Sequence, residues 1–314
     1  MRRYVLRRVA AFVATLFFLS ALVFVVVRVL PGDPATLILG VESNPETLAR
    51  LRHAMGLDRP LALQYIDWLA RAARGDLGTS IQYDLPVGRL ILSRLPVTLP
   101  LALMAAALMV IIALPLGVYA ATHHRRAGDY LAMLVSQLGI AVPAFWSGLL
   151  LILLFSVRLG WLRSGGFDGW SAGLWTGLKA LLLPAIALGA FQAAVLVRAT
   201  RSAVLEILRE DYVRTARAKG LAELRVIRRH ALRNAMIPIV TVMGIQLGQL
   251  VAGAIVLESV FALPGLGRLA LGAISARDLP VVQGVTLFVA ASIVFINFAV
   301  DLAYAALDPR IRYE

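Results

Sequence analysis

Apolar residues lie in long uninterrupted blocks, and most polar residues lie between these blocks. A helix needs about 20 apolar residues to cross a bilayer, and six blocks reach that length. We therefore predict an all-α polytopic membrane protein with six transmembrane helices, at residues 9–30, 97–121, 131–157, 179–200, 237–257 and 281–307. The first block is too long for the apolar part of a secretory signal and no A-x-A site follows it, so we expect a retained span. Pro143 predicts a kink in the third.

Basic residues predict the orientation of the six spans, because Lys and Arg accumulate on the cytoplasmic side. Four Arg precede the first span, Arg125 and Arg126 follow the second, ten Lys and Arg lie from 198 to 233, and Arg310 and Arg312 close the chain. The long outer segment, 31–94, has seven Arg balanced by seven Asp and Glu. We therefore predict that both termini are cytoplasmic.

The composition is typical of a membrane protein and excludes several kinds of functional site. The chain has 314 residues, is 60% hydrophobic and 16% charged, and has a mean hydropathy of +0.81. It contains no Cys, which excludes disulfides, thiolate metal sites and Cys nucleophiles. The net charge of +13 is mostly explained by the orientation signal, so nucleic acid is not an expected partner, whereas membrane lipid is.

The outer segment, 31–95, contains helix signals and is expected to be a helical loop. Asn44 and Pro45 predict a helix that ends at Gly56, Pro60 predicts a second that ends at Gly75, and Pro86 predicts a third. Such helices fit an amphipathic cover on the membrane face or a docking surface for a soluble partner, and the two interpretations are compatible.

A second outer connection follows the fifth span. Pro264, Gly265 and Gly267 predict a tight non-helical turn, which is an ordinary connection or a re-entrant gate element. Glu258 lies at the membrane edge just before this turn. An ionisable group at that depth is expected to face water or a partner.

The inner segment between the fourth and fifth spans, about 201–236, is unusually long and basic. Residues 204–219 are compatible with a helix, Gly220 allows a sharp change of direction, and residues 222–234 are compatible with a second helix. A basic inner loop fits anchoring of the topology or contact with anionic lipid. Apolar residues interleaved with its ten Lys and Arg favour protein docking.

The same segment carries a family resemblance. Its sequence DYVRTARAKG, residues 211–220, with HALRNA at 230–235, resembles the EAA loop of bacterial ABC-importer permeases of the dipeptide/oligopeptide/nickel group, glutathione-type permeases included. Arg214-Thr215-Ala216 takes the place of E-A-A, and Gly220 matches the family glycine. The missing Glu departs from the general pattern and resembles the peptide-type variant.

Five further motifs follow the family order along the chain. They are LPGDP at 30–34, GDLGTS at 75–80, AVPAFW at 141–146, ESVF with PGLG at 258–267, and Asp301 with DPRIR at 308–312. Together they resemble the first, B-type permease subunit of such importers.

The resemblance implies a type I ABC-importer permease fold, a multi-pass location in the bacterial inner membrane, and several partners. These are a second related permease subunit, two ATPase subunits and an extracytoplasmic substrate-binding protein. The chain has no G-x-x-x-x-G-K-[ST] loop, so it is not expected to be an enzyme or to hold a cofactor; ATP and Mg²⁺ are expected in the ATPase subunits. The residues expected to couple to the ATPases are Arg214, Thr215, Ala216, Lys219, Gly220, Leu221 and His230.

Polar residues within spans are candidates for a translocation pathway. In the fifth span, Gly244, Gly248 and Ala252 form a small-residue stripe that is expected to pack on another helix. A neighbouring stripe holds Gln246 and Gln249, which are expected to face the pathway or to make interhelical hydrogen bonds. Gln137, Gln192 and Asn297 have the same two interpretations. For Asp301, near the inner interface, pairing with an Arg is expected.

Two other classes of protein compete with an ATP-driven importer of small peptides or similar solutes. An ion-gradient-driven secondary transporter predicts several buried carboxylates and no ATPase-docking loop. A membrane enzyme needs a catalytic cluster, and the four His residues do not form metal-ligand spacing with carboxylates. The chain alone does not identify the substrate, because in such systems the binding protein does much of the selection.

Overall fold

The computed structural model describes residues 2–29, 36, 44–54 and 56–307. Within these ranges the secondary structure is helical apart from one isolated bridge between Thr79 and Pro86. The predicted motif at 30–34 and the one at 308–312 lie outside the described residues.

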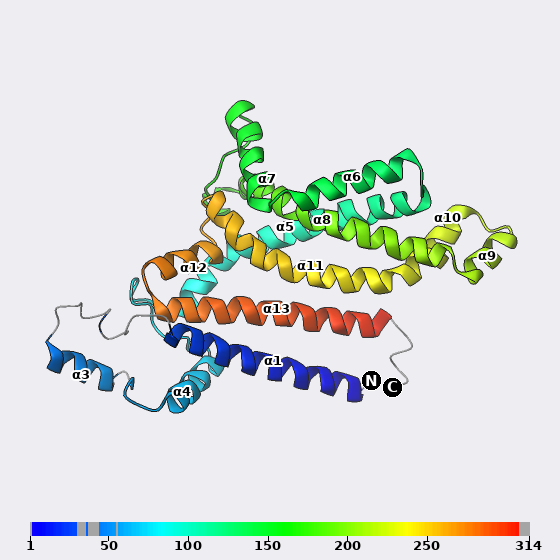
Figure 1. Ribbon diagram of the computed structural model, residues 1–314. Coiled ribbons are helices and arrows are strands. Elements are labelled where there is room, and N and C mark those ends of the chain that lie inside the picture. The colour runs from blue at the N-terminus through cyan, green and yellow to red at the C-terminus, as the bar shows by residue number, and fades with distance from the viewer. Residues whose placement is uncertain (1, 30–35, 37–43, 55, 308–314) are drawn as a thin grey trace.

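Five long helices run lengthwise beside one another and form the bundle (Figure 1). They are α1 (Arg2–Val29), α5 (Val87–Thr122), α8 (Leu174–Leu208), α11 (Leu232–Val260) and α13 (Leu279–Leu307). Among the described residues, these five are long and apolar enough to cross a membrane, and a bent helix pair brings the number up to six. The six predicted apolar blocks are therefore confirmed, with one of them divided.

The third predicted span is broken rather than kinked. Helix α6 (Ala127–Ala141) and the helix formed by α7 (Ala144–Leu151) and the π-helical η1 (Ile152–Arg158) meet at an angle of 98°. Val142 and Pro143 adopt extended backbone between them, because a proline disfavours helical backbone in the residue before it. Helix α6 follows the bundle, and α7 turns away from it (Figure 1).

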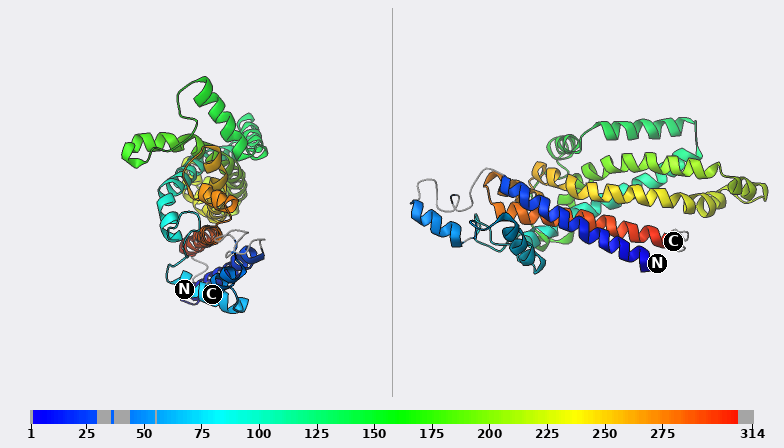
Figure 2. Two further views of the ribbon diagram at one scale, coloured as in Figure 1. Left: turned by 90° about the vertical axis from the view of Figure 1, so that its left-hand side faces the viewer. Right: turned by 60° about the horizontal axis from the view of Figure 1, so that its bottom comes forward.

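The centre of the bundle is formed by α5, α8 and α11, with α13 packed on α11 and α1 packed on α13. Glycines permit the close approaches. A Cβ on Gly117 of α5 would lie 2.6 Å from a Thr200 side-chain atom of α8, and one on Gly189 would lie 2.8 Å from the Ala105 carbonyl oxygen. Viewed along the bundle, these helices cluster while α7 projects outward (Figure 2).

Two short helices lie at the end of the bundle where α1 ends, and one of them, α4, packs on α1 (Figure 1). Helix α3 (Pro45–Ala54) begins as predicted, with the Asn44 side chain accepting a hydrogen bond from the Glu46 N–H at 3.0 Å. Helix α4 (Leu61–Ala73) packs Tyr65 and Trp68 against Phe24 of α1. The third helix predicted at Pro86 is not separate, because the residues after Pro86 are the first turns of α5.

The remaining short elements mark the two ends of the bundle. They are η2 (Trp170–Ala172), α9 (Asp211–Ala218), α10 (Glu223–Arg225), the π-helical η3 (Val226–Ala231) and α12 (Leu266–Ser275). Helices α9 and α10 lie at one end with the start of α1 and the end of α13, whereas α12, α3 and α4 lie at the other (Figure 1).

Candidate functional site

Residues 211–225, which we call the basic knob, stand at the end of the bundle on a small core of their own. The predicted single helix over 204–219 is interrupted: α8 ends at Leu208, and α9 begins at Asp211 in a new direction. Val213 and Ala216 of α9 are buried against Val226, with Ile207, Leu208 and Leu221 packed around them. This core fixes α9 against the end of α8 and against η3, and it places Ala216 inside rather than on the surface.

An ion pair joins the two arms of the knob across Gly220. The Arg217 guanidinium donates to both carboxylate oxygens of Glu223, at 3.0 and 2.7 Å. The hydrogen bond to Glu223 raises the pKa of Arg217 above its ordinary value, although partial burial acts in the opposite direction. Gly220 has φ +77°, in the left-handed region that favours glycine, which confirms the predicted change of direction.

A hydrogen bond ties the exposed side of α9 to α11. The Asn234 amide donates to the Tyr212 hydroxyl at 2.7 Å and to the His230 carbonyl at 3.1 Å. The side chain of His230 is half-buried. Thr215 is exposed, and its hydroxyl donates to the Asp211 carbonyl at 2.9 Å. Arg214, Lys219 and Gly220 are also exposed. The knob therefore presents a basic, well-supported surface at the tip of the bundle.

The end of the bundle opposite the knob is held together by a buried carboxylate on α11. Glu258 is 0% exposed. It accepts hydrogen bonds from the Thr98 hydroxyl of α5 at 2.5 Å and from the Gly267 N–H at 2.6 Å, and Thr98 in turn accepts one from the Leu266 N–H at 2.9 Å. The expectation that Glu258 faces water or a partner is wrong, because this carboxylate joins α5, α11 and the first turn of α12 inside the chain. A carboxylate suits that place, since a helix N-terminus favours negative charge.

The glycines of the predicted turn allow the start of α12 to lie close to Glu258 and to the backbone of α11. A Cβ on Gly265 would overlap the Glu258 carboxylate, and one on Gly267 would overlap backbone atoms of Ile255 in α11. Pro264, which precedes them, is half-buried. The tight turn is confirmed at Pro264 and Gly265, but Gly267 already lies in helix α12, which sequence reasoning did not predict. A gating or docking role for these residues stays a prediction.

The five predicted pathway residues are spread over four helices. Gln192 of α8 and Gln246 of α11 are buried, whereas Gln137, Gln249 and Asn297 are exposed. The Gln137 side chain accepts a hydrogen bond from exposed Arg198 at 3.2 Å. The structure of one chain leaves their role in transport a prediction.

The small-residue stripe of α11 packs against α13 at two of its three positions. A Cβ on Gly244 would meet the Val300 side chain, and one on Gly248 would meet Ile293. Ala252 is exposed, so the stripe does not continue to the outer end. The prediction that Asp301 pairs with an Arg is confirmed, since its carboxylate lies 2.8 Å from Arg8 of α1.

Comparison with known proteins identifies the family. Residues 113–313 match the family described as the inner membrane component of binding-protein-dependent transport systems, and residues 1–102 match its N-terminal component. The chain belongs to this permease family. It is therefore a multi-pass permease subunit of the bacterial inner membrane, of the ABC-importer class whose members work with a partner permease, ATPase subunits and a binding protein.

Relatives match this permease along its whole length. A putative peptide transport system permease protein of Brucella abortus strain 2308 is 44% identical over 314 residues, which is 100% of both chains. The glutathione transport system permease protein GsiC of Escherichia coli strain K12 is also 44% identical over 100% of both chains. An inward-facing structure of the MetNI methionine ABC transporter has a TM-score of 0.58 and 21% identity, covering 70% of this chain and 96% of that one. That structure shows a common fold.

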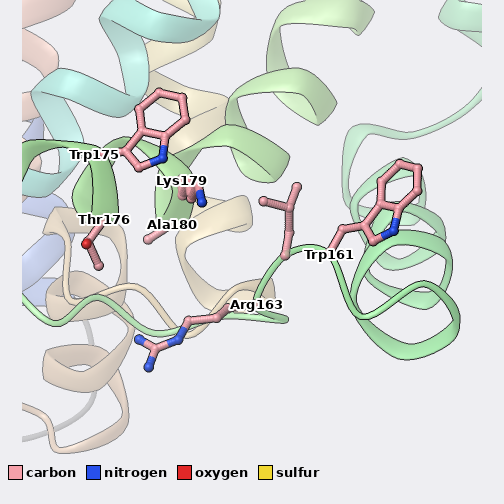
Figure 3. A pocket seen from close by; sticks show the side chains of 7 residues that line it. Trp161, Arg163, Trp175, Thr176, Lys179 and Ala180 are labelled. Atoms are coloured by element: carbon pink, nitrogen blue, oxygen red, sulfur yellow. The ribbon is translucent and has the colours of Figure 1, made fainter.

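The permease also has a cavity of about 270 Å³ between the start of α8 and the loop after η1 (Figure 3). Trp175, Thr176 and Lys179 line it from α8, and Trp161 and Arg163 line it from the loop. The Lys179 ammonium lies over the Trp175 ring, 5.4 Å from its centroid. No predicted pathway residue lines this cavity, so it stands apart from the glutamines of α8 and α11.

Sequence reasoning missed two buried groups, Asp278 and Thr98, at the end of the permease opposite the knob. Asp278, which is 1% exposed, accepts hydrogen bonds from the Ser80 hydroxyl at 2.5 Å and the Gln82 N–H at 3.1 Å. Thr98 bridges Glu258 and α12. The signal for Asp278 was its position directly before Leu279-Pro280 at the start of an apolar block, which is typical of a helix N-cap.

Proposed function

We propose that this chain is one of two related permease subunits of an importer for small peptides or glutathione-like solutes. The proposal rests on the full-length relatives, two of which are named as peptide and glutathione transport permeases. The chain has no phosphate-binding loop, so the energy is expected to come from ATP and Mg²⁺ held by two separate ATPase subunits. A binding protein outside the membrane delivers the substrate.

The observation that carries this proposal is the basic knob, which is exposed yet fixed by a core, an ion pair and the hydrogen bond between Tyr212 and Asn234. A rigid knob transmits displacement, whereas a flexible loop would absorb it. In our proposal Arg214, Thr215, Lys219 and Gly220 contact the ATPase, and the buried Ala216 and half-buried Leu221 support them. In our proposal the knob end is cytoplasmic, because the basic residues at 125–126 and 198–233 are expected on that side of the membrane.

The other end of the bundle is the substrate side in this proposal. Helices α3 and α4 form part of the surface that receives the binding protein. The junction of Glu258, Pro264, Gly265 and Gly267 holds α12 beside it as the outer gate element. Substrate then passes along the face of α11 that carries the exposed Gln249, and the buried Gln246 lies behind it.

Cross-linking tests the knob directly, because the chain has no native Cys. Thr215→Cys and Lys219→Cys permeases, assembled with their ATPase subunits, are expected to cross-link to the ATPase. Arg277→Cys, at the exposed turn between α12 and α13, is the matched control and is expected to remain unlinked. If Arg277→Cys cross-links to the ATPase as much as the knob variants do, or if the knob variants do not cross-link, the coupling role of the knob is contradicted.

A pair of substitutions at Gly220 tests whether the shape of the knob matters. Nothing lies within 4 Å of a Cβ built on Gly220, so only its backbone conformation limits substitution. Asn tolerates the left-handed region and Val does not. Gly220→Asn is expected to retain substrate uptake and transport-stimulated ATP hydrolysis, and Gly220→Val to lose both while all spans still insert. Equal activity of the two variants would contradict the proposal.

Leucine substitutions test the pathway. Gln246→Leu with Gln249→Leu is expected to reduce uptake while assembly with the ATPases persists. Unchanged uptake would leave both glutamines as packing residues.

A further inference from the structure

An ion pair between a buried carboxylate and a half-buried guanidinium joins α6 to α8 near the knob end. Asp129, in the first turn of α6, is 2% exposed. The Arg201 guanidinium of α8 donates to both of its carboxylate oxygens, with Nε to Oδ1 at 2.5 Å and one terminal nitrogen to Oδ2 at 2.7 Å. Two parallel hydrogen bonds between a guanidinium and a carboxylate fix direction as well as distance. The pair therefore sets both the spacing and the rotation of α6 relative to α8.

The turn between α5 and α6 closes over the same pair. The Arg125 N–H donates to Asp129 Oδ2 at 3.0 Å, and the His124 ring nitrogen Nδ1 lies 3.2 Å from Oδ2 and 3.1 Å from the Arg201 guanidinium. Arg125 has φ +62°, so the backbone of this turn adopts a conformation that L-residues rarely take. Three elements therefore meet at one carboxylate: the end of α5, the start of α6, and α8.

Helix α6 has few other attachments in this chain. It packs on α8 and α5, where Ala132 and Ser136 are buried and a Cβ on Gly139 would lie 3.0 Å from that of Ala194. Its opposite face is exposed and apolar, with Tyr130, Leu131, Leu134, Val135 and Leu138 each more than half exposed. Small side chains on an apolar surface do not fix the position of a helix along its neighbour. Polar contacts supply that restraint: the ion pair, and an exposed hydrogen bond from Arg198 of α8 to Gln137 of α6 at 3.2 Å.

A short stretch of continuous helix connects the ion pair to the knob. Arg201 precedes Leu208, the last residue of α8, by about 10 Å of helix at 1.5 Å per residue. Helix α9 begins after two linking residues, and Leu208 belongs to the core that holds Val213 and Ala216. A displacement of the knob therefore reaches Arg201 through an unbroken helix end.

We propose that Asp129 and Arg201 form a clamp through which α8 carries the bent third span when the knob moves. The inference rests on the proposed coupling role of the knob and adds to it the residues that pass the movement on. Both are positioning residues, since neither contacts substrate or ATP. Without the clamp, the knob still docks and ATP is still hydrolysed, but α6 does not follow α8.

The test uses the full transporter complex in lipid vesicles and four variants. Asp129→Asn and Arg201→Gln each break the clamp, and the double reversal Asp129→Arg with Arg201→Asp restores opposite charges. Asp168→Asn is the matched control, because it breaks the exposed ion pair between Asp168 and Arg163 in the loop after η1. Transport per ATP hydrolysed is expected to fall about fivefold or more in both single variants, the size of a typical coupling energy. The double reversal is expected to recover at least half, and the control to match the wild type.

A distance measurement separates the clamp from a purely structural role. Spin labels at Leu134→Cys on α6 and Glu206→Cys on α8, both exposed positions, report how the two helices move relative to each other. In the wild type their distance is expected to stay constant between nucleotide-free and ATP-bound states, and in Asp129→Asn to broaden or shift. A constant distance in Asp129→Asn would overturn the clamp. An equal loss of assembly, ATP hydrolysis and transport that the double reversal does not rescue would also overturn it.

The two proposals fail differently. If Thr215→Cys does not cross-link to the ATPase in the wild-type background, the coupling role of the knob is lost. If it cross-links in the Asp129→Asn background and transport per ATP is unchanged, only the clamp is lost.

Discussion

Gly267 offers the sharpest test of the outer junction. The change is Gly267→Ala, one methyl group in the first turn of α12. That methyl would lie 2.8 Å from the carbonyl oxygen and the Cβ of Ile255 in α11, and closer still to the Ile255 Cα, whereas ordinary contact begins at 3.4 Å. These are mostly backbone atoms of a long helix, so a side-chain rotation does not relieve the overlap. Helix α12 has to move.

The size of the movement follows from these distances. Restoring ordinary contact needs a shift of α12 by about 1 Å, since carbon atoms pack best at 3.5–4.0 Å. The Gly267 N–H now lies 2.6 Å from Glu258, and such a shift lengthens that distance to roughly 3.6 Å, beyond hydrogen bonding. Overpacking costs about 1–3 kcal/mol. A buried donor left without a partner adds about 1–3 kcal/mol. We expect Gly267→Ala to lower the free energy of unfolding by about 2–6 kcal/mol in total.

The matched control lies on the same helix. Nothing lies within 4 Å of a Cβ built on Gly272, so Gly272→Ala adds the same methyl group without contact. Because Ala stabilises a helix relative to Gly by about 0.5–1 kcal/mol, this variant is expected to unfold at or slightly above the wild-type temperature. The assay is thermal unfolding of the purified permease in detergent. If the two variants unfold at the same temperature, the close packing of α12 on α11 does not hold.

Three further outcomes follow from other contacts. Gly189→Ala places a methyl group of α8 2.8 Å from the Ala105 carbonyl oxygen of α5 and should lower the free energy of unfolding by about 1–3 kcal/mol. Thermal unfolding of this variant, compared with that of Gly272→Ala, measures the loss. Asp278→Ala leaves the Ser80 hydroxyl and the Gln82 N–H without their acceptor and should accelerate amide hydrogen exchange at 78–86, while exchange in the knob stays unchanged. Tyr212→Phe removes the hydroxyl that accepts from Asn234 and should cost about 0.5–1.5 kcal/mol, with chemical denaturation as the measurement.

Much of the fold is predictable because the hydrocarbon of a membrane offers the backbone no hydrogen-bonding partners. A chain that crosses hydrocarbon satisfies its backbone hydrogen bonds internally, so long apolar blocks become helices. The ends of these helices are less predictable. Helix α5 begins ten residues before the predicted span, because Val87, Leu90 and Ile91 are buried against α12 and α13 although Arg89 and Arg94 interrupt the apolar run. Hydropathy averages over such a segment, and only the tertiary contact reveals it.

The knob was predictable in outline, since the family motif, Gly220 and the interleaved apolar residues all mark it. Its internal structure was not. The break after Leu208 and the burial of Ala216 depend on Val226, which reaches the same core from the other side of the Gly220 turn. The burial of Glu258 was harder still to predict, because its partner Thr98 is 160 residues away in the sequence. A carboxylate at the edge of a span looks exposed until its donors are known.

The buried carboxylates bear on how the transporter is driven. Among the residues that the structure describes, three Asp and Glu side chains are buried: Asp129, Glu258 and Asp278. Each lies at the N-terminus of a helix, respectively α6, α12 and α13, where the helix dipole favours a negative charge. Each also holds a polar side chain from a different helix or loop. A proton or ion relay needs carboxylates that exchange partners, and groups held by several fixed donors resist such exchange. The charges inside this permease therefore favour helix positioning, which agrees with an ABC-importer permease rather than with a transporter driven by an ion gradient.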